Sequence, residues 1–460
     1  MTNIRLLINK KTMTMKAQRL TLHKQAKIVE AIDEGQQLYT ILFYKNEFIQ
    51  AKKTTAIKQD SFLRQAYQQG TTYDTNHPLV SALLSEDKTY RVISSNQLFE
   101  KLKGKYTPIE MLYVLSMLDN FLSHEKIQKL AKTVFYQQRR NGQVKKAFRT
   151  LINYLQIRPN DRFAKDMLHH IDFQRYKETY EQKDTLMANW TDPLYIEATN
   201  YRYDQPLAVL KTLANYFQQN ERTFDELAIR YGMIRNYSLQ DESSELERIS
   251  QLIASLLNEE QQCQLWLTLL DDVTEPSYII NHIADCNGEQ YLLPYFLDRK
   301  TSPQSLDHQL IETAIRKTDA KTLLDLQDQL WSTIHDTYRD QSSQLESIFK
   351  LLIQKLLPYV TPNQLMQEIG AYELPIVQRL THMQELEDNP DKQFQLGMIY
   401  FELELYDAAI SCFEWEMELS PTDSQPLQYL HKAHLAKGDS KTAENYKQLL
   451  INLQSRAASS

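Results

Sequence analysis

A group of basic side chains and one tyrosine recurs at helical spacing between residues 129 and 140. Its members are Lys129, Lys132, Tyr136, Arg139 and Arg140. Steps of three and four residues place side chains on one face of an α-helix. Four cationic groups around an aromatic ring suit an acidic peptide, a chain-terminal carboxylate or a phosphate. An ordinary solvated basic face has the same pattern, and the sequence leaves both interpretations open.

Residues that hold metals or transfer protons are present, but without the partners that such sites need. His431 and His434 share a helix face, yet no neighbouring cysteine or carboxylate cluster completes a metal site. Helical di-metal sites use Glu-x-x-His units, and no histidine here has glutamate three residues before it. We therefore expect no catalytic residue, no metal and no cofactor, and a protein that is not an enzyme.

Glycine is scarce, with nine residues in 460, and no two glycines are closer than the 27 residues between Gly370 and Gly397. This spacing excludes the paired-glycine motifs of dinucleotide turns, phosphate loops and nucleophile elbows. Strand-rich folds use glycine in their turns, whereas helices avoid it. We also find no long run of clear period-two alternation. The composition therefore predicts an all-α fold.

The stretch 394–423, FQLGMIYFELELYDAAISCFEWEMELSPTD, has the pattern of two antiparallel helices in close contact. The interior positions are Leu396, Gly397, Tyr400, Ala409 and Phe413, with Pro421 after the second helix. The small residues at 397 and 409 allow the helices to approach. This spacing resembles the tetratricopeptide repeat (TPR), a helix–turn–helix unit of about 34 residues. One departure is Glu416, where the family usually has a small residue.

Two other segments resemble the same repeat. Ala443 opens the second helix of a unit that directly follows, and upstream Ala147 and Leu151 line a helix that ends at Pro159. The match is good at about 128–161 and 390–455. The resemblance is to TPR proteins of the bacterial cytoplasmic type, and it implies a solenoid of helical hairpins with degenerate repeats in the middle.

We expect four regions along the chain. They are a basic N-terminal helical region at 1–105, TPR-like helices at 106–190, a degenerate helical-repeat region at 191–385, and a C-terminal TPR pair with a polar cap at 386–460. The first region is basic because seven lysines and arginines precede the first acidic residue, Glu30.

The resemblance also indicates which residues face a ligand. In the family the first helix of each pair lines the concave groove, so the basic face at 129–140 would lie there, and near the C-terminal end Met398, Phe401 and Glu402 would do so. Tyr136 stands where the chaperone-binding clamp of the family has asparagine, so we do not predict chaperone-tail binding.

The function that the resemblance implies is a non-catalytic scaffold or adaptor that binds a protein or an acidic peptide in the groove. Two alternatives stay open: a peptide-responsive TPR regulator, and an RNA- or nucleic-acid-associated protein that uses the basic N-terminal face.

We expect a cytoplasmic protein without a membrane span, because no apolar run approaches the length of a spanning helix. The three cysteines are dispersed, which fits a reducing compartment. The acid-free start also resembles an organelle transit peptide, and this alternative stays open.

Overall fold

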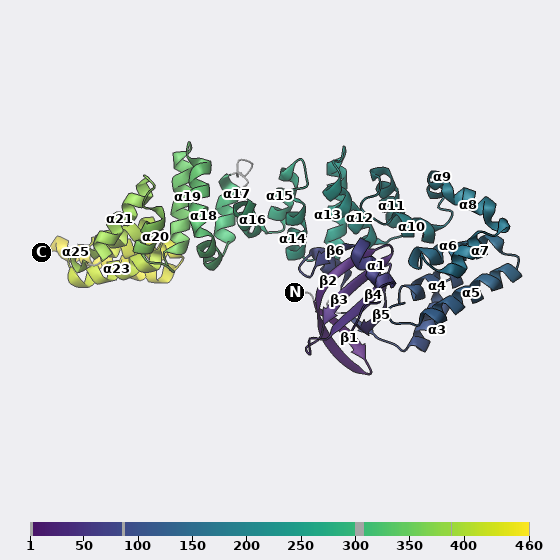
Figure 1. Ribbon diagram of the computed structural model, residues 1–460. Helices are drawn as coiled ribbons and strands as arrows, with labels where there is room; N and C mark the ends of the chain where they lie inside the picture. The colour runs from purple at the N-terminus through teal and green to yellow at the C-terminus, as the bar shows by residue number, and fades with distance from the viewer. Residues whose placement is uncertain (1–2, 85–87, 300–307, 388, 460) are drawn as a thin grey trace. The chain divides into compact units, whose positions relative to one another are not determined.

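The chain forms two compact units, Met1–Asn287 and Gly288–Ser460 (Figure 1). This computed structural model describes residues 3–84, 88–299, 308–387 and 389–459. Hydrophobic clusters occur within each unit. The region bounds that the sequence suggests at 105, 190 and 385 stay predictions.

The first unit begins with a seven-stranded sheet. The strands are β1 (Asn3–Ile8), β2 (Lys11–His23), β3 (Ala26–Ile32), β4 (Leu38–Tyr44), β5 (Glu47–Lys53), β6 (Thr71–Asp74) and β7 (Thr89–Arg91). Their order is β5-β4-β3-β2-β1-β7, and β6 pairs with the second half of β2. All pairs are antiparallel except β1 with β7.

The prediction of an all-α fold is wrong, and so is the helical character expected at 1–105. The scarcity of glycine did not indicate an absence of hairpins, because the hairpin turns use other residues at positive φ. Asn9 and Lys10 have φ of 49° and 67°, and Lys24 and Lys45 have φ of 55° and 53°. Two-residue hairpin turns need a left-handed backbone, for which glycine is the easiest but not the required residue.

A β-bulge in β2 obscures the strand pattern in the sequence, because it shifts the phase of the alternation between buried and exposed residues. Met15 and Ala17 are buried, and after the register shift between Ala17 and Arg19 the buried apolar residues are Leu20 and Leu22. After an extra residue in one strand, the buried positions change from odd to even residue numbers. The alternation is therefore present, but in two short runs of different phase.

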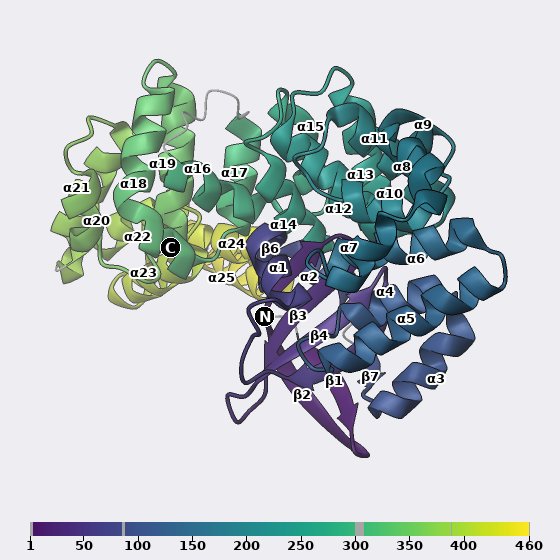
Figure 2. The same cartoon turned by 45° about the vertical axis from the view of Figure 1, so that its right-hand side comes forward.

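Three helices cover one face of the sheet. They are α1 (Phe62–Gln69), α3 (Ser95–Lys105) and α4 (Pro108–Ser116). Figure 2 shows the ribbons of α3 and α4 beside the strands. Ile28 and Leu42 of the sheet pack with Phe62, Leu98 and Tyr113 of these helices in one hydrophobic cluster. This burial supplies the main driving force that holds helices to sheet.

The first unit has further α-helices, one before α3 and the others after α4. They are α2 (Pro78–Leu83), α5 (His124–Arg140), α6 (Val144–Ile157), α7 (Arg162–Leu168), α8 (Gln174–Glu181), α9 (Lys183–Ala188), α10 (Pro193–Asn200), α11 (Leu207–Gln219), α12 (Thr223–Asn236), α13 (Glu242–Leu256), α14 (Glu259–Leu269) and α15 (Pro276–Asp285). Consecutive helices pack on each other, as α5 with α6 and α11 with α12 do. Ala147 and Leu151 are buried in α6, and Pro159 follows its end.

A buried charge network joins strand β3 to helix α12. Lys27 and Asp225 form an ion pair, and both side chains are fully buried. Arg222 contacts Asp225 at 2.8 Å and Glu197 at 2.6 Å, and the Tyr201 hydroxyl donates to Asp225 at 2.8 Å. Burial lowers the pKa of Lys27 to about 8. Burial acts to raise the pKa of Asp225, but its cationic partners outweigh this and hold it at about 2.

The described part of the second unit is helical. It contains α16 (Leu292–Arg299), α17 (His308–Lys317), α18 (Ala320–Tyr338), α19 (Ser342–Leu356), α20 (Pro362–Ile369), α21 (Pro375–Glu387), α22 (Gln393–Glu402), α23 (Tyr406–Leu419), α24 (Gln425–Lys437) and α25 (Ser440–Ser459). The starts of α23 and α25 are 34 residues apart. The last four helices pack in sequence order, so this part has the TPR-like arrangement of helical hairpins.

The contact between α22 and α23 is centred on a glycine. A Cβ added at Gly397 would lie 2.7 Å from Cε1 of Phe413 and 3.0 Å from Cβ of Cys412. Leu396, Ala409 and Phe413 are buried, and Pro421 follows the end of α23. Within the described residues, no helix is both long enough and apolar enough to cross a bilayer.

Candidate functional site

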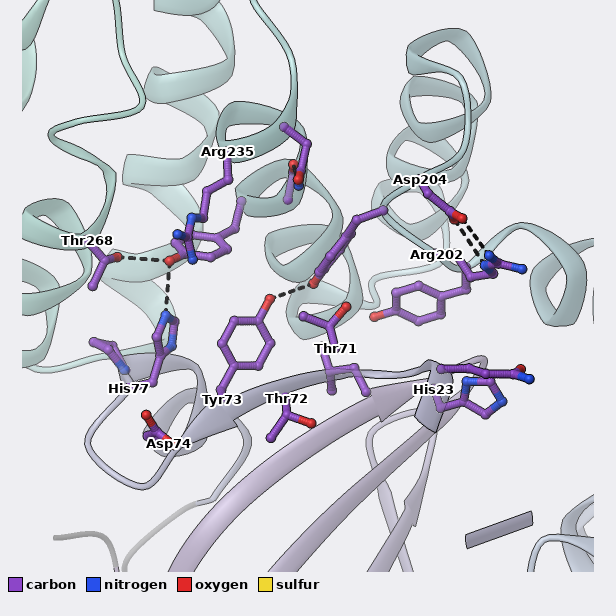
Figure 3. Close-up of a pocket in the computed structure, with 18 of the residues that line it drawn as sticks. His23, Thr71, Thr72, Tyr73, Asp74, His77, Arg202, Asp204, Arg235 and Thr268 are labelled. Carbon is purple, nitrogen blue, oxygen red and sulfur yellow. Dashed lines mark hydrogen bonds and ion pairs between the residues drawn. The ribbon is translucent and has the colours of Figure 1, made fainter. Parts of the chain in front are cut away.

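A large cleft in the first unit lies between strand β6 and the helices α12 and α14 (Figure 3). Its volume is about 1300 Å³. Five tyrosines line it, namely Tyr73, Tyr201, Tyr203, Tyr231 and Tyr237. The charged residues in its lining are Arg202, Arg235, Asp74 and Asp204. We call this space the β6 cleft.

A pair of tyrosines joins the two sides of the β6 cleft. The Tyr73 hydroxyl on β6 donates to the Tyr203 hydroxyl at 3.0 Å. The ring of Tyr203 lies against Gly232 of α12, where an added Cβ would be 2.4 Å from Cδ1 of that ring. Burial raises the pKa of both tyrosines well above the ordinary value, so both phenols stay protonated at neutral pH. This contact fixes the distance between strand and helix.

A second chain of hydrogen bonds crosses the β6 cleft at His77. The Leu79 amide donates to Nδ1 of His77 at 3.2 Å, which places the ring proton on Nε2. Nε2 then donates to the Tyr231 hydroxyl at 3.0 Å, which donates to Thr268 at 3.1 Å. Thr268 in turn donates to the carbonyl of Leu265 at 2.7 Å. Both nitrogens of His77 are therefore occupied by protein groups.

The histidines at the β6 cleft are neutral near pH 7. Burial, with the positive charge of Arg235, lowers the pKa of His77 to about 4. Burial, followed by the charges of Lys24 and Arg202, lowers the pKa of His23 to about 3. His23 is only 3% exposed, and its Nε2 has no hydrogen-bond partner among the described residues.

The charges at the cleft are divided between its two ends. Near His23, Arg202 pairs with Asp204 at 2.5 Å, and Lys24 donates to the neutral carbonyl of Gln156 at 2.9 Å. At the other end Arg235 pairs with Asp272 at 3.2 Å. The side chain of Asp74 has no ion-pair partner in the part of the chain that the structure describes, and the residue is exposed.

The basic face predicted at 129–140 lies on α5. Lys129 and Arg140 are exposed. The Nζ of Lys132 lies 5.2 Å from the ring centroid of Phe163, and the Tyr136 ring is 6.0 Å from the same ring. Tyr136 is 45% exposed.

Arg139 of the same face is engaged by the protein itself. It pairs with Asp172 at 2.6 Å, and its guanidinium lies 5.4 Å from the ring centroid of Phe173. The fold therefore brings Lys132 and Tyr136 together at Phe163 and turns Arg139 toward an acidic partner. Ligand binding at this face stays a prediction.

The second predicted surface lies on α22 and is partly covered. Met398 and Phe401 are half-buried and pack against the cluster around Ala409 and Leu430. The ring centroids of Phe401 and Tyr429 of α24 are 5.7 Å apart. Glu402 is exposed and lies 3.6 Å from Arg379. A role for these residues in partner binding stays a prediction.

None of the residues that line the β6 cleft was selected from the sequence. Two local signals were present: the segment Thr71–His77, TTYDTNH, and the tyrosines at 201 and 203. Their meaning depends on residues about 130 positions apart coming into contact, which no local pattern contains. Within the described residues, no three histidine, cysteine or carboxylate side chains gather as a metal site requires.

The fold and the β6 cleft define a class, namely a sheet-and-helix unit with an aromatic cleft followed by helical hairpins. No known protein family matches the sequence, and no curated protein matches it. Two solved structures, described as the human IFIT1 dimer with PPP-AAAA and with m7Gppp-AAAA, align with 75% of this chain and 94% of theirs. Their sequence identities are 10% and 12%, and both TM-scores are 0.19. A TM-score this low supports no inference about this protein.

Proposed function

We propose that this protein is a non-catalytic scaffold that binds a polypeptide segment of a partner in the β6 cleft. The observation that carries the proposal is the size and lining of that cleft. Pockets for small molecules have volumes of about 300–1,000 Å³, and the volume here is about 1300 Å³. Tyrosine and arginine, which line it, are with tryptophan the residue types most enriched among those that dominate protein–protein binding energy.

The state of the titratable groups supports binding over catalysis. A general base needs a free nitrogen or carboxylate poised near neutral pH. Both nitrogens of His77 are hydrogen-bonded, and its pKa of about 4 makes it a weak base. Burial raises the pKa of Tyr73 and Tyr231, so neither supplies a phenolate near neutrality. These groups join strand to helix, which suits a rigid binding surface.

The exposed face of α5 supports a second contact with an acidic partner. Tyr136 is 45% exposed, and Lys129, Lys132 and Arg140 surround it on the helix. Aromatic and cationic side chains in this arrangement suit acidic peptides. We expect Lys132→Glu combined with Arg140→Glu to weaken capture of such a partner by at least fivefold, measured by pull-down from native extract. Unchanged capture would remove this face from the proposal.

The β6 cleft itself is tested with a matched pair of variants. Gln69 is exposed at the end of α1 and lines the cleft, whereas its neighbour Gln68 is exposed and is not part of the described lining. Gln69→Trp should obstruct part of the cleft, and Gln68→Trp should leave it open. Full-length tagged protein is used to capture cross-linked partners, which mass spectrometry then identifies.

Two results separate the alternatives. We expect wild type and Gln68→Trp to retain the same polypeptide partner and Gln69→Trp to lose most of it. If wild type retains no polypeptide above a tag-only control, the proposed function is wrong. If Gln69→Trp retains the partner as well as wild type does, the β6 cleft is not the binding site.

A further inference from the structure

The β6 cleft follows the edge of a strand. Successive side chains of a strand point to opposite faces of its sheet. All four residues of β6, Thr71 to Asp74, nevertheless line the cleft. A single space contacts residues whose side chains point to both faces of a strand only if it runs along the edge of the strand, beside the backbone.

The edge of β6 away from β2 has no partner strand among the described residues, and the Asp74 carbonyl at the end of β6 accepts from the His77 amide at 2.9 Å. Leu20 pairs with Tyr73 and Thr21 with Thr72, so β2 occupies one edge of β6. Among the described strands none lies on the other edge. An unpaired strand edge presents a row of backbone N–H and C=O groups to any extended chain that reaches it. Addition of a strand is a common way for proteins to bind extended peptides.

The charges around β6 give the edge a direction. At the Thr71 end of β6, Thr71 pairs with Leu22, which precedes His23. The cations near His23 are Lys24 and Arg202, and the one carboxylate paired there is Asp204. The combined field of the two cations reaches His23, where it adds to burial in lowering the pKa. This end of the strand is therefore positive.

The opposite end of β6 is negative. Asp74 closes the strand there, and Asp272 balances Arg235. Opposite Asp74 on β2, Arg19 is paired with Glu30. The exposed carboxylate of Asp74 therefore leaves one net negative charge at this end among these residues. An extended chain laid along the edge would place a basic group near Asp74 and an acidic group near Arg202 (Figure 3).

We propose that an extended segment of a partner protein adds to the sheet as a strand antiparallel to β6, with a basic residue toward Asp74 and an acidic residue or terminal carboxylate toward Arg202. The strand β6 runs from the positive end to the negative end, and a segment that is basic first and acidic last runs the other way. This inference rests on the proposed function and specifies how the partner binds.

The probe is a library of random seven-residue peptides displayed on phage and selected on the full-length protein. Selected peptides are synthesised and their dissociation constants measured. Because Asp74 and Arg202 are exposed, the variants Asp74→Lys and Arg202→Glu should fold normally. Glu34→Lys and Arg64→Glu change equally exposed residues outside the described lining and serve as controls.

We expect selected peptides to carry lysine or arginine in their first half and aspartate or glutamate in their second. Asp74→Lys should weaken them by about five- to tenfold, and a peptide with an acidic first half should regain that affinity. The amides of residues 71–74 should exchange hydrogen more slowly in the complex. The two control variants should bind as wild type does.

Two other results have distinct meanings. Peptides that bind but protect a different segment, such as α5, or that ignore Asp74→Lys, would overturn strand addition and leave the proposed scaffold function standing. If no peptide is enriched over a protein-free selection, the proposed function itself is overturned together with the strand model.

Discussion

The hydroxyl of Tyr73 lies 3.0 Å from the hydroxyl of Tyr203, and this bond joins strand β6 to the segment between α10 and α11. Tyr73 is only 5% exposed, so its hydroxyl has little access to water as a replacement partner. A buried phenol without a partner loses the free energy of its hydrogen bond. The contact is therefore both a link across the β6 cleft and a source of stability.

Removal of that hydroxyl should be measurable. We expect Tyr73→Phe to lower the free energy of unfolding by about 1–2 kcal/mol, because Tyr203 would keep a poorly hydrated hydroxyl. Thermal unfolding by calorimetry checks this. Tyr136→Phe, which changes a tyrosine with 45% exposure, is the control and should shift the midpoint little. Equal shifts in both variants would show that the bond contributes nothing.

Gly232 should tolerate no side chain. The Cβ of Gly232→Ala would lie 2.4 Å from the Tyr203 ring, well inside van der Waals contact. We expect the free energy of unfolding to fall by about 1–3 kcal/mol, as for other overpacked sites, and Tyr203 to move away from Tyr73. The matched control is Gly104→Ala in α3, where an added Cβ has no neighbour within 4 Å. That change should stabilise by about 0.5–1 kcal/mol through helix propensity.

Acid should destabilise the first unit partly through its histidines. The folded pKa values of His77 and His23 are about 4 and 3, below the value of about 6.5 for unfolded histidine. The folded form thus favours neutral rings. The contribution of the two neutral histidines to the free energy of unfolding is fully present above about pH 6.5. It is lost as pH falls through 4 for His77 and then 3 for His23. At about 1.4 kcal/mol for each pKa unit, full protonation should lower the free energy of unfolding by about 3 kcal/mol for His77 and about 5 kcal/mol for His23.

The variant His77→Gln isolates one of these contributions. Glutamine can accept from the Leu79 amide and donate to Tyr231, but it does not titrate. The difference in unfolding free energy between wild type and variant should narrow as pH falls from 6.5 to 4, and should then level off. A difference that is constant over this range would show that His77 does not titrate as stated.

The buried pair of Lys27 and Asp225 should respond unequally to its two deletions. Asp225→Ala leaves Lys27 and Arg222 as two buried cations with Glu197 as their neighbouring carboxylate. We expect the free energy of unfolding to fall by about 3–5 kcal/mol. Lys27→Met should cost less, because Asp225 keeps Arg222 at 2.8 Å and the Tyr201 hydroxyl at 2.8 Å. Chemical denaturation of both variants checks the order. A larger loss for Lys27→Met would contradict this account.

The helical hairpins near the C-terminal end could be predicted from the sequence because their determinants are local. Gly397 and Phe413 are 16 positions apart and belong to neighbouring helices. A small residue opposite a ring at helical spacing leaves few other packings, and the structure has this contact.

The sheet was hidden by two departures from the usual strand pattern. The bulge after Ala17 divides the alternation of β2, and turns at Asn9, Lys24 and Lys45 reach positive φ without glycine. Composition therefore favoured helices in a segment where pairing between neighbouring strands decided the outcome.

The sequence by itself determined the helical hairpins, the absence of paired-glycine nucleotide motifs and the basic face on α5. Only the tertiary structure decided the seven-stranded sheet and the β6 cleft, whose lining comes from residues 22–78 and 201–268. The physical reason is that helix patterns arise from residues three and four positions apart, whereas Tyr73 meets Tyr203 only when strand pairing and helix packing have both taken place.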